Sequence, residues 1–142
     1  MINQSLITTL VVDGGNDAIT FYERAFGAEV EGRLTAGDKV LFAALRIGDL
    51  LVTLCDELPG LKAPDRDADA SAFVTIYCDD ADALHARAIE AGATQLTPVS
   101  DQQHGDRAGS LRCPFGHRWA VATRIEDLAA EEIQQRIDAA MG

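Results

Sequence analysis

The chain carries the sequence RAFGA at residues 24–28 and repeats it, with a longer middle, as RAIEAGA at residues 87–93. In each copy the glycine follows an apolar pattern of helical spacing, which is where a glycine commonly ends a helix. The two copies lie 63 residues apart at their arginines and 65 residues apart at their glycines. Two further matches extend the correspondence, Asp13 with Asp79 at an offset of 66 and Gly48 with Gly116 at an offset of 68. We therefore predict an internal duplication in which small loop insertions change the offset.

Each copy predicts the same order of elements, namely one strand, one helix and three further strands. Short β-branched runs between Gly and Asp turns predict the strands, and an Asn or Asp before each helix predicts its start. In the first copy we expect strands at 6–12, 29–34, 40–47 and 50–55, and a helix from Asn16 or Asp17 to Phe26. In the second copy we expect strands at 72–78, 94–99, 110–112 and 118–125, and a helix from Asp79 or Asp80 to Ala91.

The predicted fold class is α+β, with two tandem βαβββ modules that form curved mixed sheets within one domain, residues 1–142. The modules are expected at residues 5–56 and 72–125. Between them, residues 56–71 contain two prolines, five acids and only two bases, which is typical of a solvated acidic linker. A C-terminal helix is predicted within residues 126–142, with Asp127 as its cap.

The overall charge excludes several classes of partner. The chain has 142 residues with 23 acidic and 12 basic side chains, so its net charge is −11. This balance disfavours nucleic acid and anionic membranes, and it favours a neutral or cationic small molecule over an anionic one. No apolar run approaches the roughly 20 residues of a membrane span, and no signal peptide is recognisable. Three cysteines without a Cys-x-x-Cys pair indicate a reducing compartment, so we expect a cytoplasmic protein.

Three motifs resemble one known group of proteins. They are FYERAFGA at 21–28, GDRAG at 105–109 and PFGHRW at 114–119, and the tail from 122 to 132 agrees with them. Together with the paired βαβββ modules, these motifs resemble the PhnB-like, glyoxalase-related branch of the vicinal oxygen chelate superfamily. That superfamily includes glyoxalase I, extradiol dioxygenases and bleomycin-resistance proteins. The resemblance implies a ligand cleft on the curved sheet of each module, often completed by a second subunit, so a homodimer is expected.

The resemblance also implies where a divalent metal ion would bind, on the first and fourth strands of each module. In this sequence those positions fall on Ile7, Val52, Phe73 and Ala120. A slip of one residue on the fourth strands offers no good ligand either. The branch usually carries His-Ala-Glu-Leu on the third strand, where this chain has Phe42-Ala43-Ala44-Leu45. We therefore expect no metal site and no cofactor.

One predicted loop gathers imidazole and carboxylate groups, in the sequence DQQHGD at residues 101–106. His104 and Asp106 are the candidate catalytic residues, as a general base or as an improvised metal site. The alternative is a solvated acidic loop without chemistry. Arg107 follows in the motif, and it either binds a carboxylate or carbonyl group of a ligand or fixes the loop by hydrogen bonds.

Aromatic side chains on the predicted strands are further candidates for ligand binding. Alternation groups Phe73 with Thr75 and Tyr77 on one face of a strand, which would line a cleft. Trp119 either stacks on a ligand or packs in the core or an interface. With Phe42, the full set of ligand-binding candidates is Phe42, Phe73, Tyr77, His104, Arg107 and Trp119.

Two functions remain open at this point. The first is a homodimeric protein that binds a small organic molecule in a metal-free, largely apolar cleft, because apolar residues stand at the family's metal positions. The second is a divalent-metal-dependent lyase, isomerase or dioxygenase of the glyoxalase type, acting on a small oxygen-rich substrate. The sequence identifies neither the ligand nor a clear catalytic pair, and it leaves open whether the modules pair within one chain or between chains.

Overall fold

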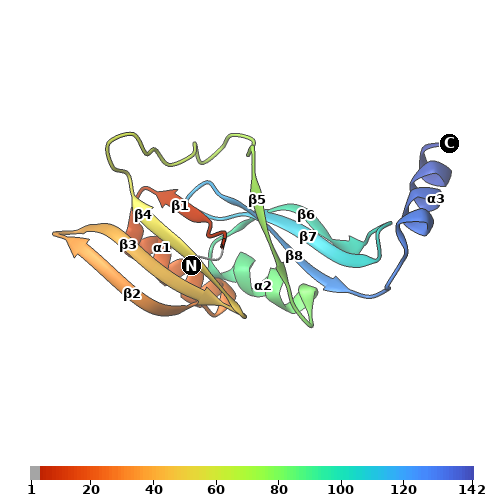
Figure 1. Cartoon of the computed structure of the whole chain (residues 1–142), viewed down its shortest axis with the longest axis horizontal. Coiled ribbons are helices and arrows are strands. Elements are labelled where there is room, and N and C mark those ends of the chain that lie inside the picture. Colours follow the sequence, from red (N-terminus) through yellow and green to blue (C-terminus); the bar gives the residue numbers. More distant parts are fainter. Residues whose placement is uncertain (1–3) are drawn as a thin grey trace.

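A computed structural model describes residues 4–142 and contains two four-stranded mixed sheets (Figure 1). The first module comprises β1 (Thr9–Val12), α1 (Gly15–Phe26), β2 (Glu29–Ala36), β3 (Lys39–Ile47) and β4 (Leu50–Asp56). The second comprises β5 (Phe73–Tyr77), α2 (Ala81–Ala91), β6 (Thr94–Asp101), β7 (Asp106–Arg112) and β8 (Arg118–Arg124). The strand orders are β1-β4-β3-β2 and β5-β8-β7-β6. The predicted α+β class with tandem βαβββ order is confirmed.

Several strands differ in their bounds from the prediction, most of all β1 and β7. β1 begins at Thr9 and not at residue 6, and β7 begins at Asp106 and not at residue 110. Because β6 continues to Asp101, the predicted loop at residues 101–106 is only a short hairpin turn. The Gln102 N–H donates to the Asp106 carbonyl at 2.7 Å and closes that turn. The polar side chains there led to the prediction of a loop. A half-exposed strand end tolerates such side chains, so the strands in fact continue through them.

Each helix begins against the last strand of its own module. α1 starts at Gly15 without a local side-chain cap. The prediction that Asn16 or Asp17 caps this helix is therefore wrong. Instead, Asp56 Oδ1 at the end of β4 accepts the N–H groups of Gly14 and Gly15, both at 2.9 Å. A Cβ atom on Gly15 would lie 2.7 Å from Val40 Cβ, so only glycine fits this approach. The cap therefore depends on a contact between residues some 40 positions apart.

In the second module, α2 has both a local cap and a cap from the sheet. Asp80 accepts from the Ala83 N–H at 3.0 Å, as the sequence predicted. Thr123 Oγ1 on β8 accepts from the Ala81 N–H at 2.8 Å. Thr123 thus performs for α2 what Asp56 performs for α1.

The core lies where α1 and α2 cover the inner faces of the sheets. Tyr22 and Phe26 of α1 pack against Trp119 of β8, with ring centroids 5.2 and 4.8 Å from the indole. The Arg87 side chain of α2 donates to the Arg24 carbonyl at the end of α1, at 2.7 Å. This contact joins the repeated arginines, so the two modules form one body with a shared core.

The C-terminal helix α3 (Ala130–Met141) lies apart from this body, beyond the end of the second sheet (Figure 1). It begins after Ala129 and not at Asp127, and none of its residues is buried. Arg136 pairs with Glu126 and ties the helix to the preceding segment. Within residues 4–142, no helix is long and apolar enough to cross a membrane.

Candidate functional site

The exposed face of the second sheet forms a concave cavity of about 340 Å³. Alternation along β5 exposes Phe73 and Tyr77, while Ala120 and Ala122 of β8 form an apolar floor beside them. Phe73 is 61% exposed and Tyr77 is 55% exposed, so both aromatic rings stand open to a ligand or a partner. The volume lies at the lower end of the range for small-molecule sites, about 300–1,000 Å³.

A buried carboxylate closes one end of this cavity. Asp106 is 1% exposed and accepts a 2.6 Å hydrogen bond from the Tyr77 hydroxyl and a 3.2 Å bond from Arg124 Nε. His104 Nε2 stands 3.3 Å from Asp106 Oδ2. Burial alone would raise the pKa of Asp106, but the bonds from Tyr77 and Arg124 outweigh it and lower the pKa. Asp106 is therefore an anion that fixes Tyr77, while half-exposed His104 lies within reach of a ligand.

A basic side chain, Arg118, closes the other end. Arg118 donates to the Ser110 hydroxyl at 3.3 Å and lies 5.9 Å from the centre of the Phe73 ring. Ser110 is also bonded to the Thr97 hydroxyl at 2.8 Å. Arg112 is the cross-strand partner of Arg118, so both arginine side chains project from the same face of the sheet. The cavity thus has an apolar floor, a carboxylate at one end and a cationic group at the other.

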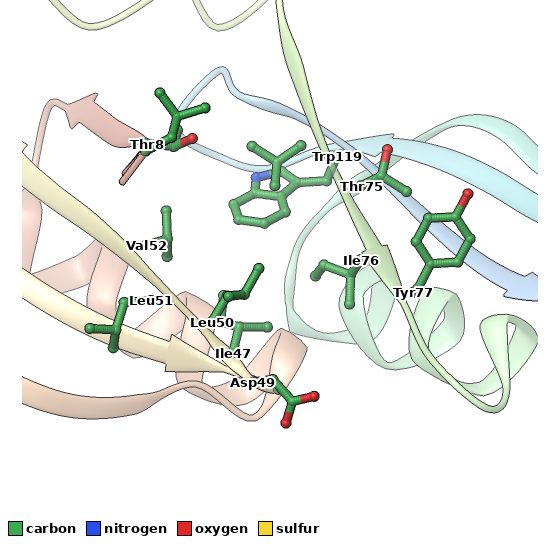
Figure 2. A pocket seen from close by; sticks show the side chains of 13 residues that line it. Thr8, Ile47, Asp49, Leu50, Leu51, Val52, Thr75, Ile76, Tyr77 and Trp119 are labelled. Atoms are coloured by element: carbon green, nitrogen blue, oxygen red, sulfur yellow. The ribbon is translucent and has the colours of Figure 1, made fainter. Parts of the chain in front are cut away.

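A second cavity, of about 380 Å³, lies between the two modules (Figure 2). Its walls are mostly apolar and come from β4 on one side and β5 on the other, including Leu50, Val52 and Ile76. Thr75 and Tyr77 border both cavities, so β5 separates them. Trp119 lies at the base of this second cavity but is 1% exposed, with its ring packed in the core.

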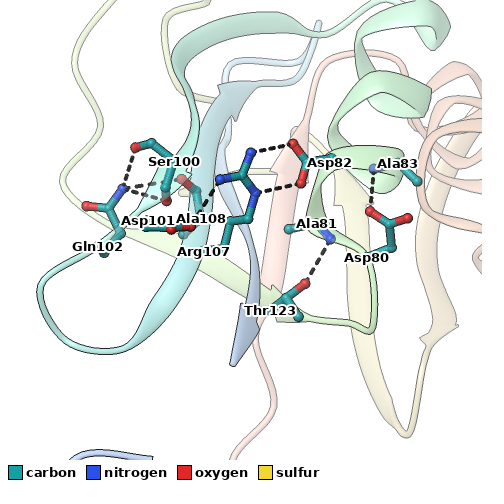
Figure 3. Close-up of polar contacts among 10 residues, drawn as sticks. All are labelled: Asp80, Ala81, Asp82, Ala83, Ser100, Asp101, Gln102, Arg107, Ala108 and Thr123. Carbon is teal, nitrogen blue, oxygen red and sulfur yellow. Dashed lines mark hydrogen bonds and ion pairs between the residues drawn. The ribbon is translucent and has the colours of Figure 1, made fainter. Parts of the chain in front are cut away.

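Arg107 lies on the opposite face of the second sheet, toward α2. Its guanidinium bonds both oxygens of Asp82, at 2.7 and 3.0 Å, and reaches Asp101 at 3.0 Å (Figure 3). The hydrogen bond from Arg107 lowers the pKa of the Asp82 carboxyl. This bidentate contact fixes the β6–β7 hairpin to α2, which is the structural alternative considered for Arg107. Of the ligand-binding candidates, the structure brings Phe73, Tyr77 and His104 together and leaves Phe42, Arg107 and Trp119 outside this cavity.

The positions expected for metal ligands can now be located by strand register. Thr9 pairs with Thr53 in the first sheet, and Thr75 pairs with Ala120 in the second. Thr53 therefore corresponds to Ala120, whereas Val52, the predicted equivalent, faces the core and is 7% exposed. The error arose because the offset of 68 between Gly48 and Gly116 was applied to the fourth strand, whereas Ala120 and Thr53 are 67 positions apart. A one-residue slip reverses the face of a strand.

These residues do not fit a divalent metal ion. Ile7, Phe73 and Ala120 have no donor atom, and the Thr53 hydroxyl is bonded to that of Thr9 at 2.6 Å. Across residues 4–142, no group of three or more His, Cys, Asp or Glu side chains could hold a metal. His104 and Asp106 are the two such side chains that meet in the cavity, and Asp106 already accepts two hydrogen bonds.

Sequence reasoning missed the basic end of the cavity. Arg118 stands two residues before Ala120 on the same strand, so alternation places it on the face that holds the predicted metal position. That signal was present in the sequence. The opposition of Arg112 to Arg118 depends on hairpin register, which the sequence does not specify.

Comparison with known proteins agrees with this fold. The sequence model of the Glyoxalase/Bleomycin resistance protein/Dioxygenase superfamily matches residues 5–121. An uncharacterized protein of Mycobacterium bovis is 39% identical over 139 residues, covering 94% of this chain and 91% of the relative. The crystal structure of the At5g48480 product of Arabidopsis thaliana superposes with a TM-score of 0.70 at 28% identity, covering 85% of this chain and 99% of that one. A fosfomycin resistance protein from Listeria monocytogenes shares the fold, with a TM-score of 0.65 at 14% identity over 92% of this chain and 98% of its own.

Proposed function

The chain belongs to the glyoxalase/bleomycin resistance protein/dioxygenase superfamily, and on that premise we propose that it binds a small organic molecule, without a metal ion, in the cavity of the second sheet. The observation that carries this proposal is the chemistry at the four expected metal positions. Three of them lack any donor atom, and the fourth is a threonine engaged with its neighbour. Two of these residues, Phe73 and Ala120, line the cavity and give it apolar surface on which an organic molecule can lie.

A metal-dependent reaction finds less support in the side chains. A catalytic divalent ion needs about three protein ligands and an open position, and residues 4–142 bring two candidates together, His104 and Asp106. Asp106 is held by Tyr77 and Arg124, so moving it onto a metal would break both hydrogen bonds. The binding function is therefore the better account of this cavity.

The proposal includes a second copy of the chain as the cover of this open cavity. The first sheet also presents exposed apolar side chains, with Leu34 64% exposed and Phe42 44% exposed. Apolar patches on two open faces are typical of surfaces that are covered in an assembly. Since both faces occur on every chain, a homodimer can bury the first sheet of one copy against the second sheet of its partner.

Two finer assignments belong to the same proposal. The first is membership of the PhnB-like branch of the superfamily, which the resemblance of the motifs at 21–28, 105–109 and 114–119 supports. The structure leaves Cys55, Cys78 and Cys113 as free thiols, which agrees with a cytoplasmic location.

Native mass spectrometry of the purified protein, before and after soaking with Ni²⁺ or Mn²⁺, tests the metal and the assembly together. We expect a dimer that retains no stoichiometric metal. A mass shift of one metal ion per chain that survives desalting would contradict the proposal. A monomer at micromolar concentration would overturn the covering second copy.

A pair of tryptophan variants tests which cavity binds the ligand. The neutral probe 1-naphthaleneacetamide should bind the wild type, and Ala120→Trp, which fills the second-sheet cavity, should weaken it at least about tenfold. Leu50→Trp is the control, because it places the same ring in the cavity between the modules. It should change the affinity less than about twofold. The reverse pattern would assign binding to the cavity between the modules.

A further inference from the structure

Two arginines stand opposite one another on the second sheet without a counter-charge. Arg112 and Arg118 are directly paired across the antiparallel strands β7 and β8. Among residues 4–142, no carboxylate oxygen lies within 4.0 Å of either guanidinium. Arg112 Nε is buried and has no hydrogen-bond partner within that part of the chain. Like charges directly opposite destabilise a sheet, so an arrangement of this kind is balanced when an anion binds.

The first module shows what the second one lacks. Arg46 is the structural equivalent of Arg112. Arg46 is paired with the residue two positions before Thr53, and Arg112 is paired with the residue two positions before Ala120, which is the equivalent of Thr53. Arg46 forms an ion pair with Glu31 at the β-bulge of β2. The matching bulge of β6 lies between residues 95 and 97, and there the chain has Leu96. The counter-ion has thus been replaced by leucine in the second copy, while the arginine remains.

The opposing residue differs as well. Arg46 is paired with Leu51 on β4, whereas Arg112 is paired with Arg118 on β8. Relative to the first module, the second has therefore lost one negative charge and gained one positive charge at the same place. Although the whole chain carries −11, the charge at this end of the cavity is positive.

The surroundings of Arg118 suit an anionic oxygen group joined to an apolar body. The Ser110 hydroxyl accepts from Arg118, which orients the guanidinium, and the Phe73 ring lies beside it. Arginine presents parallel N–H groups that match the two oxygens of a carboxylate. The apolar floor at Ala120 and Ala122 continues from this point toward Asp106 at the far end.

We propose that Arg118, supported by Arg112 and Ser110, binds the carboxylate of a small apolar carboxylic acid whose body lies on the floor of the second-sheet cavity. This inference rests on the proposed function and names the class of ligand. It also limits the expectation, drawn from the net negative charge of the chain, that the ligand is neutral or cationic. The contacts of a bound carboxylate are short and act inside the screening length of the solvent.

The test compares two probes that differ only in charge, 1-naphthaleneacetate and its neutral amide 1-naphthaleneacetamide, by calorimetric titration of the full chain at pH 7. Wild type should bind the carboxylate about tenfold more tightly than the amide. Arg118→Gln should reduce this preference to within about twofold, mainly by weakening carboxylate binding, while Arg118→Lys should keep part of the preference. Amide binding that is retained by Arg118→Gln also shows that its cavity is folded.

Arg66→Gln is the matched control, because Arg66 likewise lies over a phenylalanine ring, 5.6 Å from the centre of Phe115, but outside the cavity. It should leave both affinities unchanged. Equal affinities of wild type for the two probes, or a preference that survives Arg118→Gln, would overturn the carboxylate site while the cavity still binds. Failure of both probes to bind wild type would overturn the proposed function itself.

Discussion

The two modules share one backbone plan but differ in what they present to solvent and in how they hold their helices. On the exposed face, Leu51 and Thr53 of the first module stand where the second has Arg118 and Ala120. The first face is apolar with one internal ion pair, whereas the second has an apolar floor between charged ends. The two modules therefore share the frame and differ in the chemistry of their faces.

On the side of the sheets that packs against the helices, it is the first module that carries a charged capping residue. Asp56 in the first module accepts three backbone N–H groups, those of Gly14, Gly15 and Val40, all within 2.9 Å. Thr123 in the second module accepts only one. Burial tends to raise the pKa of Asp56, but these three bonds outweigh it and lower the pKa. The first module thus holds its helix with a buried carboxylate, where the second uses a hydroxyl.

The largest expected effect comes from removing the side chains that cap the two helices. Asp56→Ala leaves buried N–H groups without partners and should cost about 4 kcal/mol of unfolding free energy. Its counterpart Thr123→Val removes a single bond and should cost about 1 kcal/mol. Urea denaturation of both variants measures the difference. Equal losses would show that the two caps are energetically equivalent, against the comparison drawn here.

A smaller effect is expected from making the second module resemble the first. Leu96→Glu supplies the counter-ion that Glu31 provides to Arg46, so it should pair with Arg112 and compete with a bound carboxylate. We expect the affinity for 1-naphthaleneacetate to fall about fivefold. Leu96→Gln is the neutral control of equal length and should change it little. Equal effects of the two variants would show that charge at this bulge is irrelevant to binding.

The smallest effect concerns the two arginines in the free protein. Arg112→Gln relieves the opposition to Arg118 and should raise the unfolding free energy by about 0.5 kcal/mol. Arg46→Gln removes an ion pair that is well exposed and should lower it by about the same amount. Thermal unfolding at low ionic strength compares the signs. A loss of stability in Arg112→Gln would mean that this arginine is already balanced by groups of the free chain.

The sequence predicted the frame of the fold well because local patterns encode it. Apolar spacing and glycine turns gave the order of strands and helices, and the glycine after each helix marked its end, as at Gly27. Contacts between distant residues were beyond such patterns. The cap from Asp56 and the contact of Arg107 with Asp82 depend on how each helix packs on its sheet. The correspondence of Thr53 to Ala120 depends on register between strands. Within the site, alternation sufficed for Phe73 and Tyr77, but the opposition of two arginines required the hairpin geometry.

A crystal structure of the protein with 1-naphthaleneacetate would test the central claim most directly, namely that the second module carries the ligand site. The account predicts the naphthalene on the floor at Ala120 and Ala122, with its carboxylate hydrogen-bonded to Arg118. It also predicts that the first sheet of a second copy covers this face. A probe bound in the cavity between the modules, or on the first sheet without contact to Arg118, would contradict the account.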